Sequence, residues 1–253
     1  MNYEKLAVDA VADAIAITDY LDPYVTENDK GPSWDGKFTV YSKPGNQHKK
    51  SDWLGEVPVQ VKSVQKTDMS QDEIKYPVEI SDLKNYLRIG GTMYFVVYIT
   101  PMALKKIYYC SFLPFDLQKI LKQSGKQKTK SLPFRPFPTS KNDITNIIVD
   151  CLRDMEKQSL LKNKDYGMDD AVKEFDISKL HYSMTFSGIG FTKANIPEQL
   201  LNRDVYFYAQ SDSGSITFPV KHMTAAKIIV EELAMTVGAG NVDYYDKYQI
   251  VYK

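Results

Sequence analysis

The sequence predicts an α/β (α+β) core in the first half of the chain and a β-rich second half. Three observations support this: an amphipathic helical stripe near the N-terminus, alternating valine strands that lead into a helix ending at a glycine pair, and short aromatic strands after residue 180. The chain has 253 residues, 43% of them apolar and 25% charged. This is ordinary globular composition, enough for one large domain or two small ones.

The first expected element is a helix over residues 3–20. One stripe of this helix carries Glu4, Val8, Val11 and Ile15, at successive spacings of four, three and four residues. We therefore expect Glu4 on a buried face, where a carboxylate is costly unless it meets a cation, a metal ion or solvent. The alternative for Glu4 is an acid that stabilises the first helical turn.

Two alternating strands follow an irregular connection over residues 22–36, which is rich in Pro, Gly, Asn and Asp. The first strand is expected at 37–41 and the second at 56–63. Side chains in a strand alternate between its two faces, so the second strand has one apolar and one polar face. Its apolar face carries Val57, Val59 and Val61, and its polar face carries Gln60 and Lys62.

The remaining elements follow from periodicity and from turn residues. In the first half we expect strands at 76–80, 92–99 and 106–112, and helices at 81–87 and 114–123. In the second half we expect a helix at 142–160, strands at 181–190, 205–210, 215–220 and 244–252, and a hairpin arm rather than a helix at 227–236. The predicted organisation is a domain at 1–123, a basic, proline-rich connection at 124–140, and a helix plus β-rich domain at 141–253.

Composition and motifs exclude several function classes. Thirty-two basic residues balance thirty-two acidic ones, so any contact with a polyanion must come from a local patch. The sequence has no G-x-S-x-G, Walker A or H-E-x-x-H motif. The three histidines, His48, His181 and His222, have no motif spacing, and we expect them to be surface or packed residues.

The two cysteines and the hydropathy of the chain favour one cellular compartment. Cys110 and Cys151 are not in a C-x-x-C spacing, which favours a reducing, cytoplasmic environment over a disulfide scaffold or zinc ribbon. Acidic residues interrupt the apolar N-terminal stretch, so we interpret it as a helix of the mature protein and not as a signal peptide. No uncharged apolar run reaches about 18 residues, so we expect no membrane span.

The candidate catalytic residues are Asp35, Gln60 and Lys62, with Glu4 as a fourth. Metal-dependent phosphodiester cleavage needs hard oxygen ligands for Mg²⁺ and a cation near the scissile phosphate. In Gln60-Val61-Lys62 the two polar side chains share one face of the strand. The pattern [D/E/Q]-x-K occurs five times in the chain, but only this copy lies in an alternating valine run behind a glycine-flanked acid. The alternative is that Gln60 and Lys62 form the solvated face of an ordinary amphipathic strand.

Three segments together resemble a known nuclease superfamily. They are Glu4-Lys-Leu-Ala7, Asn28-Asp-Lys-Gly-Pro-Ser-Trp-Asp-Gly36 and Val57-Pro-Val-Gln-Val-Lys-Ser63. This set resembles the PD-(D/E)xK, or restriction-endonuclease-like, nucleases, in particular their Mrr-like bacterial branch, where Gln-x-Lys replaces Glu-x-Lys. The expected order of helix, three strands, helix and strand is also similar to that family's core. The resemblance covers residues 1–123.

The resemblance implies a restriction-endonuclease-like mixed sheet flanked by helices, and DNA cleavage that depends on Mg²⁺ or Mn²⁺. Asp35, Gln60 and Glu4 would be the metal-facing residues, and Lys62 the catalytic cation. Many members belong to bacterial restriction or anti-phage defence. The sequence departs from the family at Phe38, Thr39 and Val40, where relatives often carry a second acid, and at the neutral Gln60. A catalytically inactive nuclease-fold module that binds nucleic acid or a partner protein is therefore the alternative.

Nucleic-acid binding is expected from a basic segment without acids that carries Lys122, Lys126, Lys128 and Lys130. Its alternative role is a solvated linker. All candidates for metal chemistry precede residue 63, so we expect the β-rich second half to supply recognition or assembly, through DNA, a partner protein or a second protomer.

Overall fold

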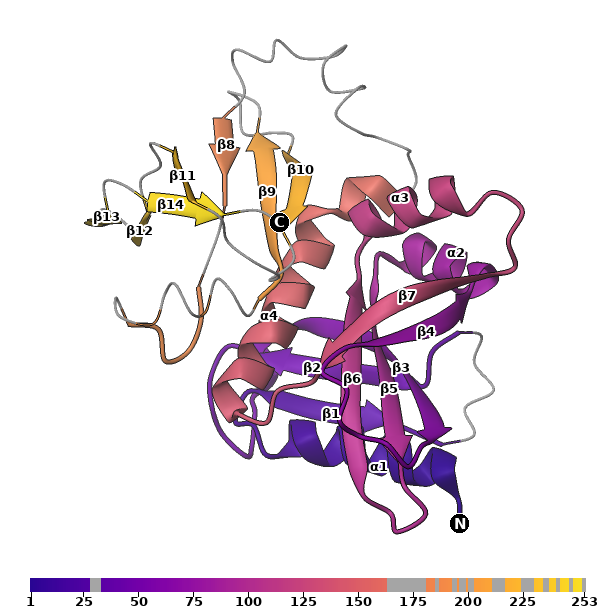
Figure 1. Cartoon of the computed structure of the whole chain (residues 1–253). Helices are drawn as coiled ribbons and strands as arrows, with labels where there is room; N and C mark the ends of the chain where they lie inside the picture. The colour runs from indigo at the N-terminus through magenta and orange to yellow at the C-terminus, as the bar shows by residue number, and fades with distance from the viewer. Residues whose placement is uncertain are drawn as a thin grey trace.

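The computed structural model shows a large mixed sheet flanked by helices and, beside it, a smaller sheet (Figure 1). It describes residues 1–27, 33–162, 181–184, 187–192, 195, 199, 203–210 and 217–223, and the backbone of 230–233, 237–239, 242–245 and 248–251. Residues 28–32, part of the segment Asn28–Gly36 on which the expected resemblance partly depends, lie outside the described residues. Within the described part, no helix has both the length and the apolar character needed to cross a membrane.

Four α-helices are described: α1 (Tyr3–Ala16), α2 (Ile80–Ile89), α3 (Pro114–Ser124) and α4 (Lys141–Lys157). Each begins and ends near its predicted bounds. Helix α2 ends at Gly90, which has a φ of 99° and so occupies the left-handed region that glycine adopts without strain. Helix α3 begins with Pro114. Proline has no backbone N–H, and at the first position of a helix this loses no hydrogen bond, because N–H groups there have no intrahelical acceptor. Short 3₁₀ turns cover Lys50–Asp52 and Ser159–Lys162.

The large sheet has seven strands in the order β1-β2-β3-β5-β6-β7-β4. They are β1 (Leu21–Val25), β2 (Gly36–Tyr41), β3 (Trp53–Gln65), β4 (Ile74–Glu79), β5 (Thr92–Ile99), β6 (Lys105–Phe112) and β7 (Thr129–Pro136). Only β3 and β5 pair in parallel, and α2 lies in the connection between them. The other neighbours are antiparallel, so the sheet is mixed, as predicted.

Each face of the sheet has its own apolar core. One core joins Val57, Val59 and Val61 of β3 to residues of α1 and α4. The other joins alternate residues of β5, such as Tyr94 and Val96, to α2 and α3. Strand β5 is buried along its whole length because both faces are covered, which explains its unbroken apolar sequence.

Strand β1 lies in a segment expected to be an irregular connection. It pairs with β2 through Leu21↔Val40 to Val25↔Gly36 and forms one edge of the sheet. Pro23 lies within this strand. An edge strand tolerates proline because one side of its backbone makes no ladder hydrogen bonds. The composition of this segment is typical of a turn, and for this reason the strand was not predicted.

The prediction of an exposed connection over residues 124–140 is wrong for most of its length. Residues Thr129–Pro136 form β7, which lies between β6 and β4. Leu132 and Phe134 alternate into the second core and are 7% and 1% exposed. Strand β7 pairs with β6 only at Pro136 and Arg135, so the prolines interrupt few hydrogen bonds.

The predicted boundary near residue 140 does not separate two cores. Helix α4 buries Ile144 and Ile148 completely in the core shared with α1 and β3. Tyr206 and Tyr208 of strand β9 (Val205–Gln210) belong to the same core. A helix at this position was predicted correctly, but it packs on the first-half sheet instead of forming the start of a separate domain.

The second half contains short strands, as predicted. Strands β8 (His181–Ser183), β9 and β10 (Thr217–Met223) form a three-stranded antiparallel sheet in the order β10-β9-β8. Two further antiparallel pairs follow: β11 (Val230–Leu233) with β14 (Tyr248–Val251), and β12 (Val237–Ala239) with β13 (Val242–Tyr245). The strand interpretation of residues 227–236 is therefore correct for Val230–Leu233.

Candidate active site

The candidate site lies where β3 changes its neighbours. The first half of this strand pairs with β2, from Trp53 to Val59, and the second half pairs with β5, from Val59 to Gln65. Strand β2 begins at Gly36, opposite Val59, and Asp35 is the residue just before it. The two strands therefore part at the point where the predicted acid meets the predicted Gln-x-Lys motif. Beyond Val59, β2 no longer pairs with this edge of β3, so the backbone groups there need other partners.

The Asp35 carboxylate takes the place of a missing strand partner. The backbone N–H of Asp35 donates to the Val59 carbonyl at 2.8 Å, which continues the hydrogen-bond ladder between β2 and β3 by one step. Two residues further along β3 the acceptor is the Asp35 side chain and not a strand carbonyl: the Val61 N–H donates to Asp35 Oδ2 at 2.7 Å. The Gln60 side-chain amide donates to the same oxygen. The structure thus brings Asp35 and Gln60 into direct contact across 25 residues of sequence.

Gln60 and Lys62 share the face of the sheet that α2 covers. In the parallel register Gln60 lies beside Tyr94 and Lys62 beside Val96, and both neighbours belong to the core built with α2. Gln60 is 3% exposed, whereas Lys62 is exposed. The site therefore has a buried polar floor and a cation at its solvent side. The predicted alternation of β3 is confirmed, with its valines on the opposite face.

Glu4 is placed differently from the expectation. The stripe of α1 that contacts the sheet contains Val8, Val11 and Ile15, as predicted, but Glu4 is exposed in the first turn. Helix α1 packs on the valine face of β3, opposite to the face of Gln60 and Lys62. The expectation that Glu4 is buried is wrong, because a carboxylate at a helix N-terminus is stabilised by the helix dipole while it stays in water. The structure gathers Asp35, Gln60 and Lys62, and it does not place Glu4 on their face.

The donor set at this point consists of oxygens. Gln60 Nε2 lies between Asp35 Oδ2 and the Val61 carbonyl oxygen, which it approaches to 3.4 Å. The amide nitrogen of Gln60 thus occupies a position between two oxygen atoms, where a metal cation could bind in its place. With the amide turned over, Gln60 would add a third oxygen to those of Asp35 and Val61. Mg²⁺ prefers such ligands and keeps several waters, so the residues fit this ion in chemical type.

The charge at the site is low for a metal centre. The described residues contain no group of three or more His, Cys, Asp or Glu side chains arranged to hold a metal ion. Asp35 supplies one negative charge and Gln60 supplies none. A site with one carboxylate binds a divalent cation more weakly than one with two or three, because fewer charges offset the loss of hydration.

Helix α2 contributes residues that the sequence did not identify. Ser33, two residues before Asp35, donates its hydroxyl to Asp82 Oδ1 at 2.7 Å and accepts from Asn85 Nδ2 at 2.8 Å. The partners are separated by 49 and 52 residues in sequence. Asp82 appeared only as one of five [D/E/Q]-x-K matches, and nothing in that pattern signals a contact with the loop before β2.

Two buried tyrosines lie in the core on this face of the sheet, Tyr86 on α2 and Tyr94 on β5. Burial raises the pKa of Tyr86 and of Tyr94 well above its usual range, and Asp82 and Asp35 add smaller effects in the same direction. The Tyr86 hydroxyl is buried and has no hydrogen-bond partner. Both phenols therefore stay neutral.

The predicted basic segment adjoins the start of α2. Ile80, the first residue of α2, donates its N–H to the Lys128 carbonyl at 2.9 Å, and Lys130 is paired with Val78 in the β4–β7 ladder. Lys122, Lys126 and Lys128 are exposed, and Lys130 is half-buried. The backbone of Lys128 therefore lies beside the end of α2 that carries Asp82. In Figure 1 the turn between α3 and β7 projects at the same side of the molecule as α2.

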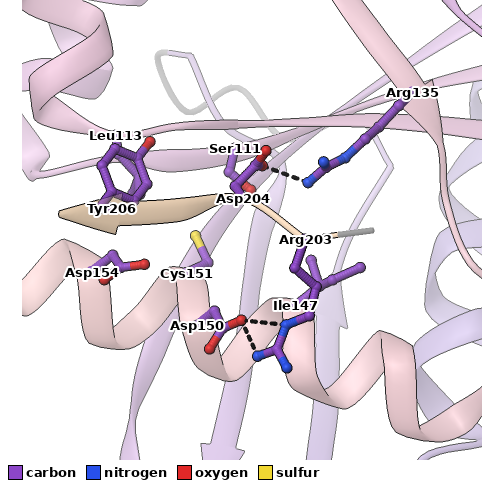
Figure 2. A pocket seen from close by; sticks show the side chains of 10 residues that line it. All are labelled: Ser111, Leu113, Arg135, Ile147, Asp150, Cys151, Asp154, Arg203, Asp204 and Tyr206. Carbon is purple, nitrogen blue, oxygen red and sulfur yellow. Dashed lines mark hydrogen bonds and ion pairs between the residues drawn. The ribbon is translucent and has the colours of Figure 1, made fainter. Parts of the chain in front are cut away.

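A second polar cluster is buried away from this site, between α4 and the segment 203–206. Figure 2 shows Asp150 pointing at Arg203, and Arg135 pointing at Asp204, around a cavity of about 20 Å³. Arg203 Nε donates to Asp150 at 2.7 Å, and Arg135 pairs with Asp204 at 2.5 Å. The cavity has room for about one water molecule. A space of this size cannot hold an organic substrate.

The ionisable groups of this cluster are held in place by one another. Burial raises the pKa of Asp154 to about 6, opposed by Arg153 and by the hydroxyl of Tyr208, which donates to it at 2.9 Å. Burial also raises the pKa of Cys151, so the thiol stays protonated and unreactive. The cluster therefore joins α4 to the second-half strands. Cys110 and Cys151 are both free thiols, as expected.

The three histidines have the structural surroundings that were expected. His48 stacks on Tyr41, with ring centroids 3.8 Å apart. His222 is packed between Asp116 and Asp204 and stacks on Tyr206 at 4.2 Å. His181 is exposed on β8. The described surroundings of His48 and His222 are stacking and ion-pair contacts.

Comparisons of the chain with protein-family models, with curated proteins and with solved structures found no match. The function is therefore inferred from the residues that meet where β3 stops pairing with β2 and pairs with β5.

Proposed function

We propose that the protein is a DNA endonuclease of the PD-(D/E)xK type that depends on Mg²⁺ or Mn²⁺. The observation that carries the proposal is the meeting of Asp35 with Gln60 where β3 leaves β2 and joins β5, with Lys62 two residues further along the same face. An acid, an amide and a lysine in this arrangement combine the oxygen ligands and the cation that phosphodiester hydrolysis requires.

The order of elements supports this proposal in part. The three strands expected between the first two helices, at 37–41, 56–63 and 76–80, correspond to β2, β3 and β4, and helix α2 and strand β5 follow them. Strand β1 precedes them as an additional strand, and β4 lies at the far edge of the sheet. Strands β3 and β5 are parallel and adjacent.

Asp35 and Gln60, with the Val61 carbonyl, would hold the metal ion. When bound, this ion would polarise the scissile phosphate and lower the pKa of an attacking water. Asp35 is kept in place by the Val61 N–H, so the carboxylate is oriented before any ligand arrives. Lys62 is exposed next to this floor, where its ammonium group can contact a phosphate oxygen and stabilise the charge that develops there.

DNA is the proposed substrate because the basic segment adjoins the start of α2, the helix that packs on the face of Gln60 and Lys62. Lys122, Lys126 and Lys128 are exposed and lie in a run without acids, on a protein whose overall charge is zero. Contacts between lysines and phosphates give affinity without sequence preference. The proposal includes a role in bacterial restriction or anti-phage defence in the cytoplasm, with the second-half strands as a surface for DNA, a partner protein or a second protomer.

One observation favours a second candidate function. Gln60 is neutral and already donates to Asp35, so the site is satisfied without a metal ion. A nuclease fold that binds nucleic acid or a partner protein without cleaving it would keep this arrangement. The two functions differ in one measurable property, which is phosphodiester hydrolysis.

The experiment that tests the proposal is cleavage of supercoiled plasmid by the full-length protein, with Mg²⁺, with Mn²⁺ and with a chelator. We expect nicked or linear products only when a metal ion is present, and none from the Lys62→Ala variant in a parallel preparation. DNA binding without cleavage under all three conditions would contradict the nuclease and support the inactive module.

A further inference from the structure

Ser33, in the described part of the loop that leads into β2, is tied to α2 through its hydroxyl. Ser33 uses both hydrogen-bonding capacities of its side chain, as donor to Asp82 Oδ1 at 2.7 Å and as acceptor from Asn85 Nδ2 at 2.8 Å. Asp82 and Asn85 lie three residues apart on α2 and so face the same side of the helix. The helix therefore holds Ser33 from two neighbouring positions at once.

Ser33 occupies a backbone conformation that needs such support. Its φ is 77°, in the left-handed region that residues other than glycine rarely adopt. Residues held there cost free energy and persist where surrounding contacts fix them. The described contacts of its side chain are those with Asp82 and Asn85, both half-buried on α2.

This support is transmitted to Asp35 over two residues. After Ser33 the chain passes Trp34 and reaches Asp35, whose N–H and carboxylate contact Val59 and Val61 of β3. The direction in which the chain enters β2 determines where the Asp35 carboxylate points. A loop released from α2 would leave the backbone bond to Val59 in the ladder but free the side chain to turn away from the Val61 N–H.

We propose that Asp82, Asn85 and Ser33 are positioning residues that hold the Asp35 carboxylate against the Val61 N–H. Asp82 acts through its acceptor oxygen, and its negative charge is not required. The structural part of this inference concerns the contact between Asp35 and Val61 alone. Its consequence for metal affinity rests on the proposed function, because it assumes that Asp35 is a metal ligand.

The test compares two substitutions at one position. Asp82→Ala removes both the charge and the acceptor oxygen, whereas Asp82→Asn removes the charge and keeps an oxygen that can accept from Ser33. The matched control is Asp68→Ala, because the Ser70 hydroxyl donates to Asp68 Oδ1 at the same distance of 2.7 Å, in the connection between β3 and β4. Asn85→Ala serves as a second variant that releases the other side of Ser33.

The first measurement is hydrogen exchange at the Val61 amide of the full-length protein, with the Phe95 amide of β5 as an internal reference. We expect exchange at Val61 to be about tenfold faster in Asp82→Ala and Asn85→Ala, and close to the wild-type rate in Asp82→Asn and Asp68→Ala. Unchanged exchange in Asp82→Ala would overturn the positioning role. Equal acceleration in Asp82→Ala and Asp82→Asn would show that the charge is what matters, and would overturn it too.

The second measurement is the dissociation constant for Mn²⁺, followed by its electron paramagnetic resonance without any DNA. We expect Mn²⁺ to bind about tenfold more weakly to Asp82→Ala than to Asp82→Asn. If the wild-type protein binds no Mn²⁺, the proposed metal site fails, while exchange at Val61 still decides the positioning role. If Mn²⁺ binds and its affinity is equal in all variants, the coupling between α2 and the site is refuted.

Discussion

His222 offers a quantitative test of how the second-half strands are attached to the core. It lies on β10 and is packed against Asp116 of α3, with Nδ1 2.8 Å from a carboxylate oxygen, and against Asp204, with Nε2 at 3.6 Å. Its ring stacks on Tyr206. Burial alone would lower the pKa of His222, but the two carboxylates outweigh this effect and raise it to about 9.

The sign and size of the effect on stability follow from this pKa. The folded protein keeps the proton of His222 up to about pH 9, whereas the unfolded chain loses it near 6.5. The charged imidazole therefore contributes stability that is complete below pH 6.5 and is lost as the pH rises to 9. A difference of roughly 2.5 pH units corresponds to about 3 kcal/mol, an order-of-magnitude value for a side chain that is 13% exposed.

The assay is urea unfolding of the wild-type protein and of His222→Gln from about pH 6 to about pH 10. We expect the wild type to be more stable by about 3 kcal/mol at the acid end, and this difference to disappear at the alkaline end. Asp116→Asn, which removes the nearer carboxylate, should remove most of the same pH dependence. A difference between wild type and His222→Gln that stays constant over the whole range would refute the reasoning.

Three further predictions concern the site and the core. Lys62→Ala should abolish plasmid cleavage and change the melting temperature by no more than about 2 °C, because the side chain is exposed. Val57→Ala, which shortens a fully buried side chain on the other face of β3, should lower the melting temperature by about 3 to 6 °C. Below its melting transition the Val57→Ala protein should still cleave plasmid. A Lys62→Ala protein that cleaves like the wild type would remove this residue from the mechanism. Asp35→Asn should raise the Mg²⁺ concentration needed for half-maximal cleavage by about tenfold or more, measured by Mg²⁺ titration, since the one carboxylate in contact with Gln60 is lost; an unchanged titration would exclude Asp35 as a ligand. A fragment ending at residue 136 should fail to fold by circular dichroism and thermal unfolding, because it lacks the buried face of α4; a cooperative transition in this fragment would show that the first-half sheet is self-sufficient.

Local patterns predicted much of the fold. The alternating valines of β3, the unbroken apolar run of β5 and the glycine pair after α2 each specify one element through near neighbours in sequence. The closeness of Asp35 and Gln60 follows from the same patterns, because Asp35 precedes the first residue of β2 and Gln60 lies on the adjacent strand β3. These features depend on periodicity and turn chemistry, which a single sequence contains.

What the sequence did not predict depends on tertiary position. Pro23 and Pro133 read as loop residues, although strands with an unpaired side accommodate proline, and edge position is a property of the assembled sheet. The burial of Glu4 was inferred from helical spacing alone, which does not show which turns of the helix are covered by the sheet. The link from Ser33 to α2 joins residues about fifty positions apart, and no local pattern encodes it.

The central claim is that Asp35 and Gln60 form a metal site, and the most direct test is the metal-dependent stability of Gln60→Glu. This substitution would place a second carboxylate against Asp35, so repulsion should lower the melting temperature by about 3 to 8 °C in a chelator. Saturating Mg²⁺ should restore it, because an ion between the two carboxylates binds the folded state alone. The isosteric Gln60→Met, which supplies no oxygen ligand, should show no such recovery. A Gln60→Glu protein that melts at the same lowered temperature with and without Mg²⁺ would contradict a metal site at Asp35 and residue 60.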